Sequence, residues 1–186
     1  MQLFPLHKMC KKAEYNLDVL HRRSIRLYGY DYSCGGLYFI TICCRNRMCL
    51  FGKIINDEMV LNDAGRMAEQ EWANTMSVRS GDVVLHDFVI MPNHMHAIIE
   101  ITHSSVAQSL HATLRSPSQT LGAIVRGYKS AVSRQLGSSV WQRNYYEHII
   151  RNSKSYGKIA EYIMNNPANW RGDDLYVDSS EDYRGL

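Results

Sequence analysis

Residues 83–101 read VVLHDFVIMPNHMHAIIEI, and this stretch decides the fold. Two apolar runs flank the dipeptide Pro92-Asn93, which is typical of a tight turn. After the turn, apolar side chains recur at every second residue, which predicts a β-strand whose odd-numbered positions face a core. The stretch therefore predicts two strands, 83–91 and 94–101, joined by a short turn.

Two histidines lie on the other face of the second predicted strand. His94 and His96 are two residues apart, and side chains at positions i and i+2 of a strand leave the same face. Two neutral imidazoles side by side form half of a metal site. An isolated His-x-His pattern is more often one core histidine and one solvated histidine. The metal interpretation therefore depends on what the rest of the chain supplies.

Further strands are indicated on both sides of this pair. Residues 37–42 read LYFITI, a β-branched and aromatic run typical of a central strand. Residues 51–60 contain the turn signal Asn56-Asp57 and predict a hairpin. Residues 141–150 alternate enough to predict one more short strand.

Apolar residues at helical spacing predict three helices. Asn62 can cap the first helix, which we expect to run to about residue 76. Its expected buried stripe is Ala64, Ala68, Trp72 and Met76. Thr120 can cap the second helix, and Ser153 can cap the third, which Pro167 ends.

The order of these elements is strands, helix, two strands, helix, strand, helix. This order predicts an α+β fold in which helices pack on an antiparallel sheet. It is compatible with a ferredoxin-like or RRM-like palm. Residues 103–119 are Ser-rich and nearly uncharged, which predicts a flexible loop between the second strand pair and the second helix.

Composition limits the class of protein. The formal net charge is +3, but basic residues gather in residues 1–26 and 121–154, which suggests a polyanionic partner. No apolar run reaches the ~18 residues of a membrane span, and no secretory pattern opens the chain. We therefore expect a cytoplasmic, nucleoid-associated protein with no membrane partner. The five cysteines contain no Cys-x-x-Cys pair, so neither a disulfide framework nor a zinc ribbon is indicated.

The last predicted helix offers the second half of a site. Tyr162 and Asn166 are four residues apart and are neighbours on one helix face. A phenol can attack a phosphodiester if a cation neutralises the phosphate. His94, His96 and the amide oxygen of Asn166 would form a three-ligand site that suits Mg²⁺ or Mn²⁺. Alone, Tyr162 could be a packing residue and Asn166 a helix-end residue; their joint presence favours a catalytic interpretation.

Several motifs occur in an order known from one family. They are RRSIRL (22–27), YDY (30–32), YFIT (38–41), LFG (50–52), LNDAG (61–65), VIMPNHMH (89–96), WQRNYYEHIIRN (141–152) and YIMNNP (162–167). Through them the chain resembles the REP-associated tyrosine transposases, whose HUH motif is matched by the two histidines. The resemblance covers roughly residues 22–176 as a single domain, with an N-terminal tail at 1–21 and an acidic C-terminal tail at 177–186.

The resemblance implies a metal-dependent endonuclease and strand transferase that acts on single-stranded or hairpin DNA. Tyr162 would attack a phosphodiester and form a 5′-phosphotyrosine intermediate, and His94 and His96 would hold the metal. Related transposases often have Gln four residues after the tyrosine, where this chain has Asn166.

Basic side chains are the expected contacts to the DNA backbone. Arg22, Arg23 and Arg26 cluster before the first strand, and we expect them near the foot of the hairpin. The further expected contacts are Arg126, Lys129 and Arg143.

Two other functions stay open at this point. The first is a non-catalytic module that binds single strands on the same sheet, with aromatic platforms such as Tyr38 and Phe39. The second is a small metallohydrolase in which His94 and His96 activate a water. The single helix after residues 141–150 favours a monomer acting in cis, with a homodimer as the alternative.

Overall fold

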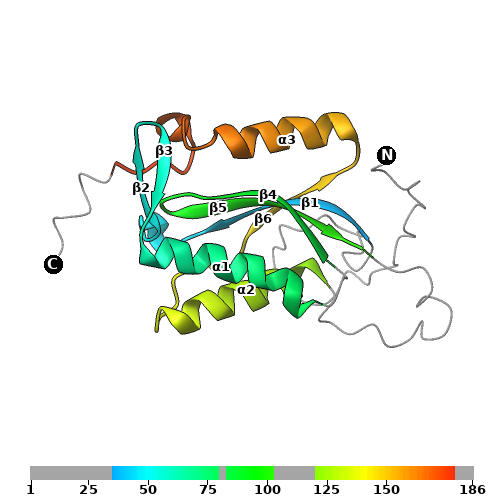
Figure 1. Ribbon diagram of the computed structural model, residues 1–186, viewed down its shortest axis with the longest axis horizontal. Helices are drawn as coiled ribbons and strands as arrows, with labels where there is room; N and C mark the ends of the chain where they lie inside the picture. Colours follow the sequence, from blue (N-terminus) through cyan, green and yellow to red (C-terminus); the bar gives the residue numbers. More distant parts are fainter. Residues whose placement is uncertain (1–34, 80–82, 103–119, 179–186) are drawn as a thin grey trace, which may run out of the picture.

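The computed structural model describes residues 35–79, 83–102 and 120–178 (Figure 1). The N-terminal tail, Arg22, Arg23, Arg26, the loop 103–119 and most of the acidic tail lie outside the described residues.

Within the described residues, four antiparallel strands form the central sheet, in the order β4-β5-β1-β6. Their bounds are β1 (Gly36–Cys43), β4 (Val83–Ile90), β5 (His94–Ile101) and β6 (Tyr146–Ile150). A separate hairpin of β2 (Gly52–Ile55) and β3 (Glu58–Leu61) stands at one end of the sheet (Figure 1). It turns at Asn56 and Asp57, both with positive φ, as the turn signal predicts.

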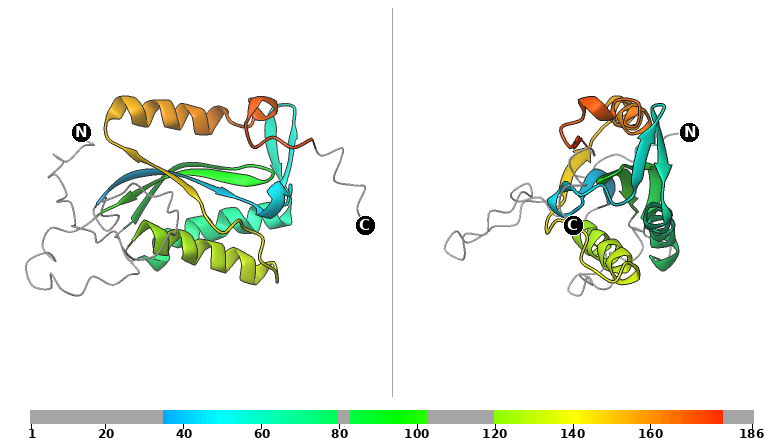
Figure 2. Two further views of the ribbon diagram at one scale, coloured as in Figure 1. Left: turned by 180° about the vertical axis from the view of Figure 1, so that it is seen from behind. Right: turned by 90° about the vertical axis from the view of Figure 1, so that its left-hand side faces the viewer.

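In the described part of the chain, three helices cover the sheet. Helices α1 (Asp63–Val78) and α2 (Leu121–Gln135) lie on one face, and α3 (Ser153–Asn165) lies on the other (Figures 1 and 2). Short 3-10 turns occur at Arg45–Arg47 (η1) and Trp170–Gly172 (η4). The predicted α+β class, an antiparallel sheet with packed helices, is confirmed.

The strand pair predicted around Pro92-Asn93 is present. Ile90 and Met95 are paired across β4 and β5, and the amide of Met91 donates to the carbonyl of His94 at 2.8 Å. The turn therefore places His94 at the first position of β5, at the end of the sheet where the β2–β3 hairpin stands.

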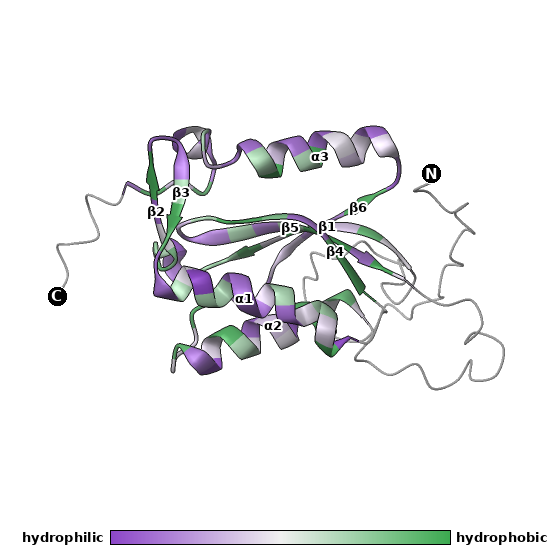
Figure 3. Cartoon of the chain, in the orientation of Figure 1, coloured by the Kyte–Doolittle hydropathy of each residue, from purple (hydrophilic) through white to green (hydrophobic). Residues whose placement is uncertain are grey.

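The two faces of the sheet contribute to two apolar cores. The larger core lies between the sheet and α1 and α2, and it includes Met95, Ala97 and Ile99 of β5. A smaller core under α3 contains five buried residues: Leu37, Phe39, Ile98, Ile150 and Ile163. The helices alternate between hydrophobic and hydrophilic positions along their length, as amphipathic helices do (Figure 3).

Helix α1 is capped as predicted, because the Asn62 side chain accepts a hydrogen bond from the Gly65 amide at 2.9 Å. The predicted buried stripe is wrong at its last member, since Met76 is 49% exposed and Thr75 is buried instead. Residues spaced by four rotate about 40° around a helix at each step, so a run of four such residues leaves the buried face.

The caps of the other two helices differ in one detail. The Thr120 hydroxyl accepts from the Ala123 amide at 3.2 Å, as predicted for α2. Asn152 rather than Ser153 caps α3, and it accepts from the Ser155 amide at 2.8 Å. Both residue types can cap, and the helix begins one residue earlier than the sequence suggests. Within the described parts of the chain, no helix has the length and apolar character needed to cross a membrane.

Candidate active site

His94 and His96 lie on the face of β5 that α3 covers. Both are buried, and their Nε2 atoms are 3.0 Å apart. The strand geometry brings them together because residues two apart leave the same face of a strand.

Each imidazole is oriented by an oxygen behind it. Asn93 Oδ1 lies 2.8 Å from Nδ1 of His94, and Thr41 Oγ1 lies 2.8 Å from Nδ1 of His96. The Asn93 oxygen only accepts, so His94 carries its proton on Nδ1 and its lone pair on Nε2. If His96 donates to Thr41 in the same way, two lone pairs face each other and repel unless a cation lies between them. This arrangement suits two ligands of one metal ion.

The histidines are held in the neutral form. Burial lowers the pKa of His94 from 6.5 to about 4. Burial, with the neighbouring His94 as a second cause, lowers the pKa of His96 to about 3. Both rings are therefore neutral at pH 7, which is the form that binds metals.

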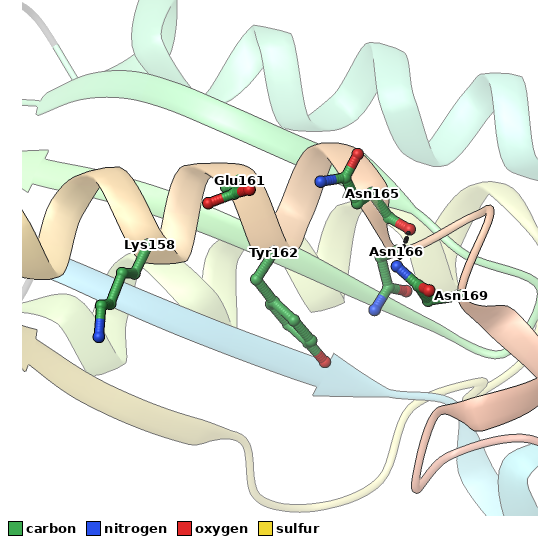
Figure 4. A pocket seen from close by; sticks show the side chains of 6 residues that line it. All are labelled: Lys158, Glu161, Tyr162, Asn165, Asn166 and Asn169. Atoms are coloured by element: carbon green, nitrogen blue, oxygen red, sulfur yellow. Dashed lines mark hydrogen bonds between the residues drawn. The ribbon is translucent and has the colours of Figure 1, made fainter.

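Tyr162 approaches the pair from α3. Its hydroxyl lies 3.2 Å from Nε2 of His96 and donates to Oδ2 of Asp173 at 3.2 Å. The side chain is 45% exposed, and its hydroxyl points away from the helix (Figure 4). Burial and the Asp173 carboxylate raise the pKa of Tyr162 to about 12, so the phenol is protonated at neutral pH.

Asn166 is the helix residue one turn after Tyr162. It is 2% exposed, and its Nδ2 donates to Oδ2 of Asp173 at 2.9 Å. Its Oδ1 is buried and has no hydrogen-bond partner within the described residues. A buried acceptor of this kind calls for a donor, a water or a cation. Its chemistry therefore fits the oxygen ligand that the sequence suggests.

Asp173 is a member of the site that the sequence analysis missed. A ligand atom from each of His94, His96 and Asp173 lies within 4.8 Å of the others. Burial acts to raise the pKa of Asp173, but hydrogen bonds from Asn166 and the Leu175 amide lower it overall. Asp173 follows Pro167 in an irregular segment, where no periodicity predicts a return to the site. An acidic residue seven positions after Asn166 was the only signal.

Two hydrogen bonds hold the segment that carries Asp173 against the candidate site. Arg47 donates to the Asp174 carbonyl at 3.1 Å, and Asn93 Nδ2 donates to the Leu175 carbonyl at 2.9 Å. The Trp170 ring centre lies 5.9 Å from that of His94. Asn93 thus links the turn before β5 to the segment after α3.

A pocket of about 300 Å³ opens beside α3 next to Tyr162 (Figure 4). It is lined by Lys158, Glu161, Tyr162, Asn165, Asn166 and Asn169. The tyrosine is therefore reachable from solvent on this side of the helix.

The predicted DNA contacts on α2 lie on the opposite layer of the sheet from α3 (Figure 2). Arg126 and Arg143 are exposed. Lys129 is instead turned inward, donating to the carbonyls of Gln142 at 2.9 Å and Asn144 at 2.8 Å. Burial lowers the pKa of Lys129 to about 8. The two hydrogen bonds of Lys129 hold the segment before β6 in place.

The aromatic platforms considered for a binding module are covered. Tyr38 is fully buried in the core under α1 and α2, and Phe39 is 9% exposed beneath α3. Neither ring presents a free face on which a base could stack.

Comparisons with known proteins find similarity to transposases. The family model described as IS200-like transposase matches residues 38–166. The chain is 49% identical over 179 residues to an uncharacterized protein of Haemophilus influenzae, an alignment that covers 89% of this chain and 99% of the relative. It is 26% identical over 141 residues to a REP-associated tyrosine transposase of Escherichia coli K12, covering 75% and 71% of the two chains.

The chain is also similar in fold to a solved structure. It is a REP-associated tyrosine transposase bound to a REP hairpin, with a TM-score of 0.57 and 23% sequence identity. The match covers 78% of this chain and 74% of that chain.

Proposed function

The chain belongs to the IS200-like transposase family, and we propose that it is a metal-dependent endonuclease and strand transferase acting on single-stranded DNA beside a hairpin. Tyr162 is the proposed nucleophile. The observation that carries the proposal is the 3.2 Å approach of the Tyr162 hydroxyl to Nε2 of His96, from a helix to a strand 66 residues earlier.

The proposed metal ligands are Nε2 of His94, Nε2 of His96 and Oδ1 of Asn166. Support comes from the neutral, oriented imidazoles and from the buried amide oxygen without a partner. Mixed nitrogen and oxygen donors suit Mg²⁺ or Mn²⁺. When bound, such an ion polarises the scissile phosphate and offsets its negative charge.

In the proposed reaction the Tyr162 oxygen forms a bond to phosphorus while the bond from phosphorus to the 3′ oxygen breaks. The phenolic proton passes to Asp173, which already accepts the hydrogen bond of this hydroxyl. The departing 3′ oxygen takes a proton from water, and the hydroxide left is neutralised by the proton that Asp173 accepted. The products are a 5′-phosphotyrosine and a free 3′-hydroxyl, and the reverse step rejoins the strand without ATP.

Hairpin DNA is the proposed partner, because a relative of the same fold was solved with a REP hairpin. The proposed contacts to the DNA backbone are Arg22, Arg23, Arg26, Arg126 and Arg143. We propose that the protein acts in the cytoplasm, at the nucleoid. His94, His96, Tyr162 and Asp173 come from one chain, which supports a monomer acting in cis. We propose that residues 22–176 form this single domain.

The test is covalent capture. The protein is incubated with Mn²⁺ and a labelled library of DNA hairpins with randomised single-stranded flanks, then denatured. We expect a protein–DNA adduct that Tyr162→Phe abolishes. Tyr156→Phe, on the same helix but bonded to Asp87, serves as the matched control and should keep the adduct.

The other outcomes identify the alternatives. Binding without cleavage would indicate a single-strand binding module. Cleavage without an adduct, and unchanged in Tyr162→Phe, would indicate a hydrolase with a water nucleophile. Either result would overturn the role of Tyr162.

A further inference from the structure

Part of the sheet face on the α3 side is left open. Helix α3 packs mainly against β4 and β5, whereas β6 forms the far edge of the sheet. Tyr146 is paired with Thr41 and His148 with Phe39, so both β6 side chains lie on the α3 side. Both are exposed, Tyr146 by 56%.

This open face leads directly to the candidate active site. Thr41 is paired with His96 on one side and with Tyr146 on the other, so these three residues form one row across the sheet. The Phe39 ring links the row to the nucleophile: its centre lies 5.4 Å from His96, 6.3 Å from Tyr146 and 6.2 Å from Tyr162. Tyr146 is the exposed end of this aromatic series.

The surroundings are basic. Residues 143–158 contain Arg143, Arg151, Lys154 and Lys158, all exposed, and a single acidic residue, Glu147. Glu147 alternates with Tyr146 and His148 and so leaves the opposite face of β6. Lys158 lies one turn before Tyr162 and projects from the same side of α3 (Figure 4). The pocket itself is lined by one basic and one acidic side chain, Lys158 and Glu161, so the excess of positive charge comes from Arg143, Arg151 and Lys154.

Resting on the proposed function, we propose that Tyr146 and Lys158 hold the single strand that flanks the scissile phosphate. One base stacks on the exposed Tyr146 ring, and a backbone phosphate pairs with the Lys158 ammonium. Exposed aromatic rings combined with basic side chains are the means by which proteins bind single strands without base preference. Tyr146 thereby takes the platform role for which Tyr38 and Phe39 are too buried.

The test measures binding rather than cleavage. Affinity for a fluorescent 15-mer of thymidine is measured by anisotropy in a Tyr162→Phe background. Tyr146→Ala should weaken binding roughly tenfold, whereas Tyr146→Phe should keep it, because stacking needs the ring and not the hydroxyl. Lys158→Gln should lower the slope of log affinity against log salt by about 0.7. Arg134→Gln, on α2 in the other layer, is the matched charge control and should change neither quantity.

A second oligonucleotide separates stacking from general damage. If Tyr146 stacks on bases, the loss in Tyr146→Ala should disappear on an abasic 15-mer, while Lys158→Gln should still weaken binding. Equal losses on both oligonucleotides, or equal affinity of the Ala and Phe variants, would overturn the stacking role. An unchanged salt slope in Lys158→Gln would overturn the phosphate contact. Because Tyr162 is already replaced, these results are independent of the covalent capture test.

Discussion

The hydroxyl of Tyr162 donates to the carboxylate of Asp173 at 3.2 Å, and Nε2 of His96 lies at the same distance from it. A hydroxyl has one proton, and the bond to Asp173 uses it. The oxygen lone pairs are then free on the side of the histidines. Asp173 both orients the Tyr162 hydroxyl, the proposed nucleophile, and keeps it protonated.

The first prediction concerns the acidity of Tyr162. Burial and Asp173 raise its pKa to about 12, so Asp173→Asn should lower that pKa by removing the negative charge and the charge-assisted bond. The measurement is a pH titration of ¹³Cζ-tyrosine resonances, with an Asp173→Asn, Tyr162→Phe double variant to assign the signal. An unchanged midpoint would mean that burial alone sets the pKa.

A second prediction concerns the rate of the same variant. A more acidic phenol alone would favour cleavage, but Asp173→Asn also removes the proton acceptor. Positioned proton acceptors contribute at least roughly 100-fold, so adduct formation in Asp173→Asn should fall by about that factor. Single-turnover capture at saturating hairpin DNA measures this. A faster reaction would show instead that the Asp173 segment obstructs the site.

Sequence patterns predict the regular elements that carry the candidate site. The turn at Pro92-Asn93, the strand that carries His94 and His96, and the helix that carries Tyr162 follow from periodicity and turn chemistry. These elements are regular, so their side chains lie at positions that spacing alone determines. The position of α3 over β5 depends on the packing of Ile163 against Ile98. Periodicity does not predict this position, whereas the family resemblance implies it.

The positions of Asp173 and Lys129 do not follow from sequence patterns. Asp173 reaches the histidines through an irregular segment held by Asn93 and Arg47, and such segments have no period. Lys129 is one of the basic side chains that the sequence analysis predicts as a contact to the DNA backbone. In the structure its ammonium donates hydrogen bonds to two carbonyls before β6. Charge patterning does not reveal such a contact between separate segments.

A third prediction follows from the neutral histidines. The folded-state pKa values of His94 and His96 lie at about 4 and about 3, below the ordinary 6.5. As pH falls below about 6.5, the unfolded chain binds protons that the folded chain excludes, so the free energy of unfolding should decrease toward pH 4.

The measurement is urea unfolding at stepped pH in the presence of a chelator. The double variant His94→Gln, His96→Gln should show a flatter profile between pH 6.5 and 4, because it lacks both titrating groups. Mn²⁺ added at pH 7 should raise the Tm of the parent and leave that of the variant unchanged. Parallel pH profiles would contradict the buried neutral state.

A fourth prediction separates two residues of α2. Lys129→Gln should destabilise the fold by about 1–2 kcal/mol, since two carbonyls lose a charged donor. Arg126 is exposed, so Arg126→Gln should leave the Tm unchanged and lower only the salt dependence of hairpin binding. Thermal unfolding and anisotropy at several salt concentrations give both quantities. Equal losses of stability would show that exposure does not distinguish them.

The last prediction uses two glycines in helices. A Cβ at Gly65 would lie 2.1 Å from the Phe51 carbonyl oxygen, where the chain entering β2 meets the start of α1. Gly65→Ala should therefore destabilise the protein by about 2–3 kcal/mol through steric overlap. A Cβ at Gly157, inside α3, meets no atom within 4 Å. Gly157→Ala should stabilise by about 0.5–1 kcal/mol, because alanine loses less backbone freedom in a helix.

Urea unfolding of both variants measures these changes, and the sign difference is the decisive quantity. Gly157 lies five residues before Tyr162, so Gly157→Ala also tests whether a stiffer α3 leaves the proposed nucleophile in place. Adduct formation should persist in Gly157→Ala at the parent rate. A stabilised protein that forms the adduct more slowly would show that the reaction needs α3 to bend or shift, which the packing of this helix on a small core of five buried residues would permit.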